Sequence, residues 1–434
     1  MMRVKGLAGV VAKFGHYAWA VAALCFFVLL AAAGARSASS VLILPLAHAF
    51  GWITAIVSSA IAVNLMLFGA LGPFTAAWFE RFGVTRMVIG ALILIACGVG
   101  GTFAMTEPWQ FLLLWGILVG IGSGVISPAL AATITNRWFH KRRGLAMGIL
   151  TASSATGQMV FLPALSSLEA DYGWKAVPGP IAVISILLIP LVLVVMRERP
   201  ADVGLRPYGA LADEQTRNSI NPQSNSLAPA FQALGRGLRS REFWILFASF
   251  TVCGLSTNGL IGTHFIPTCV DHHIASMEAA RMLAFIAVFD LFGTILSGWM
   301  SDRWDNRYLL FWYYALRGLA LFYLPYAFDS TFGLGVFVIF YGLNWIATVP
   351  PTAKLLASLF GPEDGTILFG WLLVGHQLGA GIAAGGAGIA RTVLERYFEV
   401  YLLVALLCMV AAISVLFVRS KLRSAQYPLR CDNL

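Results

Sequence analysis

Residues 76–86 read AAWFERFGVTR, and residues 298–307 read GWMSDRWDNR. Both stretches place an acidic residue directly before an arginine, and the pairs Glu80-Arg81 and Asp302-Arg303 lie 222 residues apart. Each stretch follows a long apolar run. A charged connection of the same design at two places indicates that the chain contains a duplicated unit.

The composition places most of the chain in lipid. Of its 434 residues, 59% are hydrophobic and 11% are charged, against roughly 45–50% and about 25% in a soluble domain. A membrane-spanning helix needs about 20 apolar residues, and continuous apolar runs indicate helices rather than barrel strands. Twelve such segments are readable, at 17–36, 53–79, 87–106, 108–134, 144–166, 176–196, 243–266, 279–300, 308–328, 331–352, 366–390 and 397–418.

The basic residues flank these segments unequally. With both termini in the cytoplasm, the cytoplasmic side holds the basic cluster at 137–143 and seven arginines between 197 and 241. The outside loops then carry only Lys175, Arg281, Arg391 and Arg396. The positive-inside rule therefore predicts a multi-pass protein of the inner membrane with both termini cytoplasmic. The net charge of +9 follows from this topology, so no nucleic-acid partner is expected. The first apolar run is long enough to span, and we expect it to be retained rather than cleaved.

The polar stretch 198–241, rich in proline, asparagine and serine, is predicted to be a cytoplasmic linker. It separates a six-span bundle at 1–197 from a second at 242–420, and residues 421–434 form a cytoplasmic tail. The shift of 222 residues also aligns Gly120 with Gly342, Pro128 with Pro350, Gly148 with Gly370 and Gly157 with Gly379. Because each unit has an even number of spans, the two have the same orientation. We predict an all-α integral membrane protein with twelve transmembrane helices in two parallel-repeat six-helix bundles.

The two charged connections resemble the loop motif of the major facilitator superfamily, Gly-x-x-x-Asp-Arg-x-Gly-Arg-Arg. The first copy departs from the motif at Ala76 and Val84, and the second has Asp305 where glycine is expected. With the helix count and the repeat, the resemblance covers essentially the whole chain and implies the major facilitator fold. In that family such contacts latch the cytoplasmic side while the transporter faces outward. The resemblance thus implies a conformational latch, and the alternative is that these residues are ordinary charges at the membrane interface. The candidate latch residues are Glu80, Arg81, Arg86, Asp302, Arg303 and Arg307.

A few ionisable side chains fall inside the predicted spans, where they are costly and usually face water or a partner. Asp290, Arg317 and His376 lie near mid-membrane, and Arg36 lies nearer the outer end of the first span. We expect Asp290 to carry a proton or to pair with a cation in the cavity, the alternative being a structural ion pair with Arg317. His376, followed by Gln377, either switches protonation beside a carboxylate or only bridges helices.

Arg36 either attracts an anionic substrate or extends to the interface. Three amides, Gln158, Asn258 and Asn344, lie in spans whose counterparts in the superfamily line the pathway, although lone amides often just bridge helices. The candidate proton-coupling residues are thus Asp290 and His376. The candidate substrate-binding residues are Arg36, Gln158, Asn258, Arg317, Asn344, His376 and Gln377.

Several stretches look like the monocarboxylate-transporter and oxalate-formate antiporter branch, namely RRGLAMG at 142–148, YGW at 172–174 and RERP at 197–200 leading to GLRPYG at 204–209. Arg36 stands near the place of that branch's cavity lysine, and Asp290 matches its eighth-span aspartate. Thr294 occupies the position where the branch has an arginine. The resemblance therefore leaves Arg317 on the neighbouring helix as the candidate replacement for the missing charge.

The resemblance implies a secondary active transporter that moves a small, monocarboxylate-like organic anion by alternating access. Proton symport is the expected coupling, with no cofactor, and the protein is expected to act as a monomer. Efflux of amphipathic or cationic compounds by the same fold is one alternative, and a non-transporting membrane sensor is another. The chain has no GxxxxGK loop, so we do not expect ATP to drive transport. It has no CxxC spacing and no catalytic dyad, so we expect no metal site and no enzyme activity.

Overall fold

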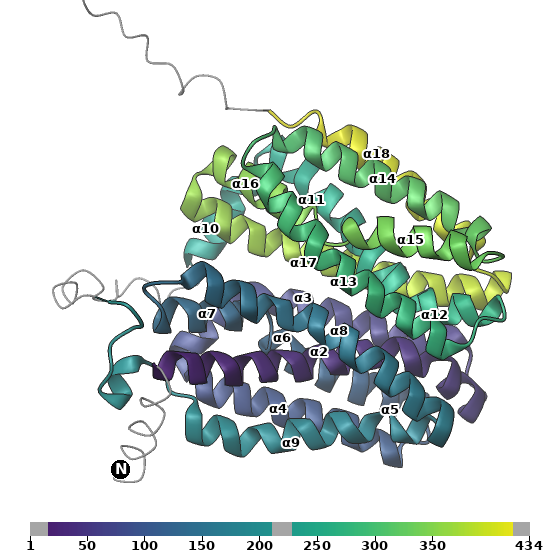
Figure 1. Cartoon of the computed structure of the whole chain (residues 1–434), viewed down its shortest axis with the longest axis horizontal. Coiled ribbons are helices and arrows are strands. Elements are labelled where there is room, and N and C mark those ends of the chain that lie inside the picture. The colour runs from purple at the N-terminus through teal and green to yellow at the C-terminus, as the bar shows by residue number, and fades with distance from the viewer. Residues whose placement is uncertain (1–15, 211–227, 420–434) are drawn as a thin grey trace, which may run out of the picture.

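The computed structural model describes residues 16–210 and 228–419. Their helices form two bundles that lie against each other, the N-terminal one below the C-terminal one in Figure 1. The N-terminal bundle consists of α2 (Tyr17–Phe50), α3 (Thr54–Phe82), α4 (Val84–Gly101), α5 (Pro108–Phe111), η2 (Leu112–Val119), α6 (Gly120–Val125), α7 (Pro128–Trp138), α8 (Arg143–Tyr172) and α9 (Pro178–Val195). The C-terminal bundle consists of α11 (Arg241–Gly254), η7 (Leu255–Ile261), α12 (Gly262–Asp271), α13 (Ser276–Ser301), α14 (Asn306–Ala327), α15 (Thr331–Leu343), α16 (Val349–Phe360), α17 (Pro362–Leu394) and α18 (Phe398–Val415).

The predicted spans are confirmed as helices. Ten helical stretches of the described residues are long and apolar enough to cross a membrane. In four of them consecutive segments form one span: α4 with the short helix Thr102–Ala104, α5 to α7, the short helix Trp174–Ala176 with α9, and α11 to α12. The remaining two predicted spans are α14 and the pair α15 and α16, which a break at residues 344–348 separates. The end of the bundles at which α2 begins and α18 ends is called the basic end here, because Arg137, Arg236 and Arg307 lie there.

The first span is longer than predicted. Small polar residues after Arg36 lower the local hydropathy, but α2 continues to Phe50 and ends at Gly51 with φ 66°. The Ser39 and Ser40 hydroxyls donate to the carbonyls of Arg36 and Ser37 within the helix, so these polar groups are satisfied locally. Arg36 therefore lies near the middle of α2 and not near its outer end, which corrects the predicted position.

The two charged connections turn differently because of one residue. In the first, Gly83 alone joins α3 to α4 at φ 87°, a backbone conformation that favours glycine. In the second, Asp305 replaces that glycine and caps α14, accepting a hydrogen bond from the Arg307 N–H at 3.0 Å. The departure from the motif thus exchanges a tight glycine turn for a helix cap.

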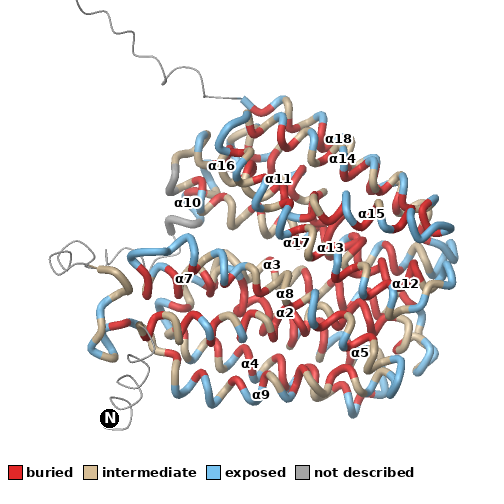
Figure 2. Tube along the Cα trace, viewed as in Figure 1, coloured by how far each residue is buried: buried red, intermediate tan, exposed pale blue. Residues whose placement is uncertain are grey.

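The apolar core is divided unequally between the two ends. One cluster of buried side chains runs through the N-terminal bundle and into the C-terminal bundle, where it includes Phe265 and Tyr341. A second cluster, which includes Phe243 and Leu310, belongs to the C-terminal bundle alone and lies at the basic end. In Figure 2, buried residues of both bundles meet around α12 and α13. The bundles therefore share a core mainly toward the end opposite the basic end.

The predicted linker 198–241 contains a helix that the sequence did not indicate. This helix, α10 (Ala228–Leu238), is bound to the C-terminal bundle by Arg236, whose Nε and Nη2 donate to Asp364 at 2.7 and 2.6 Å. The Phe231 ring contacts Phe74 of α3 and Trp371 of α17, with ring centroids 6.2 and 5.9 Å apart. The linker thus touches both bundles near the basic end.

Candidate functional site

Arg317 on α14 binds the break in the tenth span. Its side chain is almost completely buried, with 1% of its surface exposed. Nη2 donates to the carbonyls of Asn344 and Trp345 at 2.5 and 3.0 Å, and Nη1 donates to the Cys253 sulfur at 2.8 Å. The last carbonyls of a helix have no partner within it and attract a cation. Arg317 therefore stabilises the carbonyl end of α15.

Asp290 on α13 binds the same break from another helix. Its Oδ1 accepts hydrogen bonds from the Ile346 N–H at 2.9 Å and from the Thr294 hydroxyl at 3.1 Å. The helices meet here because Gly293 lies against the Leu343 backbone, where a Cβ would overlap the Leu343 carbonyl. The carboxyl group therefore binds a backbone N–H just before α16 begins, which an anion near a helix N-terminus favours.

Asp290 and Arg317 do not form an ion pair with each other. The structural ion pair that the sequence left open as an alternative is not formed, because the break lies between the two side chains and supplies partners to both. Arg317 also has little freedom to bind a substrate, since its two terminal nitrogens donate to backbone carbonyls and to the Cys253 sulfur. These partners could not be predicted from sequence, because nothing in residues 344–348 marks a helix break except Pro350 and Pro351 beyond it.

Arg36 is the predicted arginine that keeps a terminal donor without any hydrogen-bond partner. Its guanidinium carbon lies 4.6 Å from the centre of the Phe68 ring, and its Nη1 atom is buried without a hydrogen-bond partner. No carboxylate of the described residues pairs with it. A buried donor without an acceptor is costly, so the arrangement favours an anion beside Arg36.

His376 and Gln377 lie on α17 where it faces two different neighbours. The His376 ring is 5.1 Å from the Phe250 ring and interacts with Cys253, while its Nδ1 is buried without a hydrogen-bond partner. Gln377 packs against Gly69 of α3 in the other bundle, and its Oε1 also lacks a partner. Both side chains thus keep an unused polar atom inside the protein.

The three predicted amides have different surroundings. Asn344 belongs to the helix break, where its Nδ2 donates to the Tyr313 carbonyl at 2.6 Å and its Oδ1 accepts from Arg317 at 3.4 Å. Asn258 lies in η7, a π-helical segment of the seventh span, and is half-buried. Such segments are frequent at functional sites. Gln158 is half-buried on α8, away from the Arg317 contacts.

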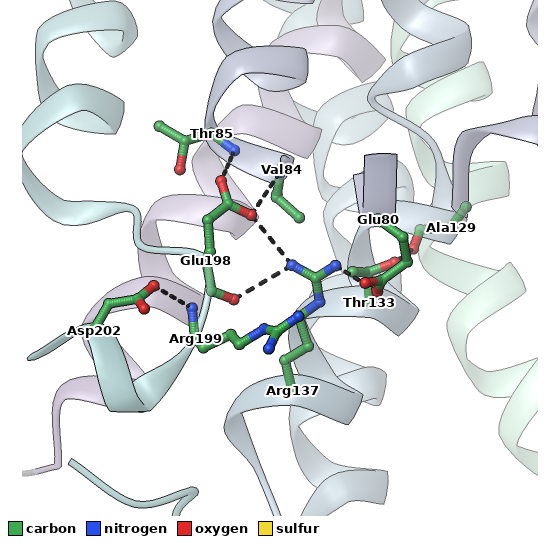
Figure 3. Close-up of polar contacts among 9 residues, drawn as sticks. All are labelled: Glu80, Val84, Thr85, Ala129, Thr133, Arg137, Glu198, Arg199 and Asp202. Carbon is green, nitrogen blue, oxygen red and sulfur yellow. Dashed lines mark hydrogen bonds and ion pairs between the residues drawn. The ribbon is translucent and has the colours of Figure 1, made fainter. Parts of the chain in front are cut away.

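The acidic residue of the first charged connection belongs to a network within the N-terminal bundle (Figure 3). Arg137 on α7 donates to Glu80 at 2.5 Å and to Glu198 at 3.2 Å. The Glu198 carboxylate in turn accepts from the backbone N–H groups of Val84 and Thr85 at 2.7 and 2.9 Å, which caps the start of α4. From sequence, Arg137 is recognisable only as one of the basic residues that define the topology, and Glu198 only as part of RERP at 197–200.

The second connection is also paired within its own bundle. Asp302 pairs with Lys354, and the Arg303 guanidinium lies 4.2 Å from the centre of the Trp299 ring. Arg307 pairs with Asp305 at 2.7 Å, and this hydrogen bond holds the pKa of that carboxyl below its usual range. Arg81 lies over the Phe82 ring and Arg86 is exposed. The latch therefore stays a prediction, since these pairs do not cross between bundles in this conformation.

A polar contact that the sequence did not indicate joins the bundles at the opposite end. Arg391, near the end of α17, donates from Nε and Nη2 to Asp271 at 3.0 and 2.7 Å. Its Nη1 donates to the Thr54 hydroxyl at 2.7 Å, across the bundle interface. The next residue, Thr392, accepts a hydrogen bond from the Ala55 N–H at 3.3 Å.

A cavity of about 320 Å³ also lies at this end, within the C-terminal bundle. The predicted site residues are not among those that line it, which are Thr268, Asp271, His272, Pro325, Phe328, Glu395, Arg396, Tyr397, Phe398 and Tyr401. The cavity is therefore separate from the buried groups around Asp290 and Arg36.

Comparisons with known proteins agree with this architecture. The model of the Major Facilitator Superfamily matches residues 24–384. The transporter YcxA of Bacillus subtilis, described as an uncharacterized MFS-type transporter, is 22% identical over 409 residues, covering 90% of this chain and 92% of that protein. Monocarboxylate transporter 13 of Bos taurus is 26% identical over 390 residues, covering 88% of this chain and 85% of its own.

Efflux proteins are also among the similar proteins. The fujikurins efflux protein of Gibberella fujikuroi is 29% identical over 246 residues, covering 55% of this chain and 47% of that protein. Among solved structures, a bacterial homologue of the human lysosomal transporter Spinster, crystallised inward-facing and unoccupied, superposes with a TM-score of 0.68 at 17% identity. That match covers 93% of this chain and 98% of the other, and it shows that the folds agree.

Proposed function

The chain belongs to the Major Facilitator Superfamily, and we propose that it moves a small organic anion, such as a monocarboxylate, together with a proton. It is a multi-pass membrane transporter and not an enzyme. Alternating access between the two bundles provides the mechanism in this proposal. The basic end faces the cytoplasm, as the positive-inside rule predicts, and one chain acts alone.

The unpartnered Nη1 of Arg36 carries the proposal for an anionic substrate. A half-buried guanidinium with a buried, unpartnered Nη1 and no carboxylate partner offers donors to a carboxylate, with which it can form a bidentate pair. Arg36 lies near the middle of α2, which is the depth at which such transporters bind their substrates. Phe68, under the guanidinium, holds it in place without neutralising it. Arg317 takes no direct part, because backbone carbonyls occupy it.

Asp290 supports the proton-coupling part of the proposal. Asp290 is 4% exposed, and its carboxyl group accepts hydrogen bonds from the Thr294 hydroxyl and the Ile346 N–H. Among the described residues, no cation lies at ion-pair distance from it. An ionised carboxylate inside a spanning helix is costly without such a partner, and binding a proton removes that cost. In the proposed cycle Asp290 takes up the proton, and His376 is the second candidate. The proton gradient drives transport, and no cofactor takes part.

Two kinds of relative favour different substrates. Monocarboxylate transporters of Bos taurus and Gallus gallus match most of this chain. The fujikurins efflux protein favours the alternative, export of amphipathic or cationic compounds by the same fold. An arginine without a carboxylate partner repels a cationic substrate, so the Arg36 environment favours the anion.

Uptake into proteoliposomes tests the proposal. We expect a panel of radiolabelled monocarboxylates to include one that accumulates when the inside is alkaline, and that loses accumulation when a protonophore collapses the gradient. A lipophilic cation should compete weakly. Absence of flux for the whole panel in correctly oriented, monodisperse protein would reject the substrate class, and strong competition by the cation would favour efflux.

A further inference from the structure

We propose that Arg391 and Thr54 form a gate at the end opposite the basic end, and that breaking their hydrogen bond is the step that opens this end. Asp271 acts as the positioning residue that aims Arg391 at Thr54. The inference rests on alternating access as proposed above. It concerns a contact outside the Asp290 and Arg36 region, and it can be tested without knowing the substrate.

The guanidinium divides its donors between the two bundles. Nε and Nη2 form a bidentate pair with Asp271, which belongs to the same bundle as Arg391. Only Nη1 crosses the interface, where it reaches the Thr54 hydroxyl at 2.7 Å. Because the planar fork fixes all five donors relative to one another, the Asp271 pair sets the direction of Nη1.

The neighbouring residue adds a second bond across the same interface. The Thr392 hydroxyl accepts from the Ala55 N–H at 3.3 Å. Ala55 lies in the first turn of α3, where backbone N–H groups have no partner within the helix. The last turn of α17 thus binds the first turn of α3 through two consecutive side chains.

Below these bonds the two helices pack too closely to admit a side chain. A Cβ on Gly388 would overlap Ser58, and a Cβ on Gly381 would lie 2.6 Å from Met66. Apolar and small-residue packing of this kind holds helices together in lipid but has little directionality. The polar contacts at its end fix the register of the two helices and close the interface to water.

The pairing pattern suits a contact that must open repeatedly. When the bundles separate at this end, Arg391 keeps its ion pair with Asp271, so no charge loses its partner. The bonds that break join Arg391 and Thr392 to a hydroxyl and an amide, which water at the opening end can replace. By contrast, an ion pair across the interface would leave two charges to be solvated at each opening.

The experiment measures access to the interface from the outer side. Ser58, buried against Gly388, is replaced by cysteine as a reporter, and its labelling by a membrane-impermeant maleimide is followed in proteoliposomes of known orientation. The same chain without S58C gives the contribution of the native cysteines. Thr54→Val is then added, which removes the hydroxyl but retains the shape and the Arg391–Asp271 pair.

We expect Thr54→Val to raise the labelling rate about 2- to 10-fold, the range that one net hydrogen bond represents. Arg391→Gln should raise it at least as much, and Arg391→Lys less. The matched control is Arg396→Gln. Arg396 lies at the same end, but it pairs with Glu399, three residues along the chain in the same bundle. Gel filtration and thermal unfolding confirm that each variant is folded.

Unchanged labelling in Thr54→Val would overturn the gate, and so would an equal increase in Arg396→Gln. Because labelling needs no substrate, it still reports on the gate if no carboxylate is transported. Failure of the proposed substrate class and failure of the gate are therefore distinguishable. Where transport is measured, Thr54→Val should lower KM for uptake from the outer side while leaving the pH dependence unchanged.

Discussion

Asp290 and Arg317 bind opposite sides of one helix break without touching each other. The carboxyl group accepts the Ile346 N–H, and the guanidinium donates to the carbonyls of Asn344 and Trp345. A cation therefore faces the end of α15 and an anion faces the residues before α16, as the helix dipoles favour. The Asp290 carboxyl group thus contacts the residues that lead into α16, which is the basic-end half of the tenth span.

Replacing Arg317 tests its structural assignment. In Arg317→Gln the carbonyls at the break lose their partner, and each buried group left unsatisfied costs about 1–3 kcal/mol. We expect a lower apparent unfolding temperature in detergent, with partial recovery in Arg317→Lys, and an unchanged KM in the folded fraction. An unchanged unfolding temperature would contradict the assignment, and a large rise in KM at normal stability would return Arg317 to substrate binding.

Asp290→Asn separates proton coupling from substrate exchange. Asparagine keeps a side-chain oxygen for Ile346 and Thr294 but cannot release a proton. We expect pH-driven accumulation to be lost while counterflow exchange of the same substrate persists. The control is Thr294→Val, which removes one hydrogen bond to Asp290 and leaves the titratable group in place. Full accumulation by Asp290→Asn would exclude this residue and leave His376 as the candidate.

Arg36→Gln tests the anion site. Loss of a charge-assisted hydrogen bond, about 1.5–3 kcal/mol, corresponds to a KM increase of roughly 10- to 100-fold. Arg36→Lys should retain part of the affinity because the charge remains. Arg281→Gln is the control, since that arginine is exposed on α13. If KM in Arg36→Gln stays within about twofold of the parent chain, Arg36 does not bind the substrate.

The network of Figure 3 predicts a stability effect at the basic end. Glu198→Ala removes both the cap of α4 and one partner of Arg137. We expect a loss of about 1–2 kcal/mol, seen as a lower apparent unfolding temperature. Asp202→Asn is the comparison, because Asp202 accepts only the Arg199 N–H in an exposed turn. Equal effects in the two variants would show that the Glu198 cap contributes nothing specific.

The spanning helices and the family could be predicted from the sequence, because both depend on residues that lie close together in the chain. Apolar runs identify spans, and the pairs Glu80-Arg81 and Asp302-Arg303 identify the superfamily. The same reasoning placed the end of the first span at Arg36, since it could not foresee that Ser39 and Ser40 would satisfy their hydroxyls within the helix. Hydropathy treats such serines as polar and therefore ends the span too early.

The hydrogen-bond partners of the buried charged residues could not be predicted from the sequence. Asp290 and Arg317 were recognised as unusual, but their partners are backbone groups at 344–346, which carry no sequence signature. Arg391 and Thr54 are 337 residues apart, and the sequence places Arg391 in an outside loop and Thr54 at the start of the second predicted span. A pattern within one helix cannot show which distant helix end it will meet.

The unequal division of the apolar core has a consequence for the resting state. With the shared core toward one end, separation at that end must expose apolar side chains and break the Arg391 contact, while the basic end has less shared core to lose. We therefore expect the chain without bound substrate to open more easily at the basic end than at the opposite end. A substrate must supply, through its own contacts with both bundles, the free energy that reverses this preference.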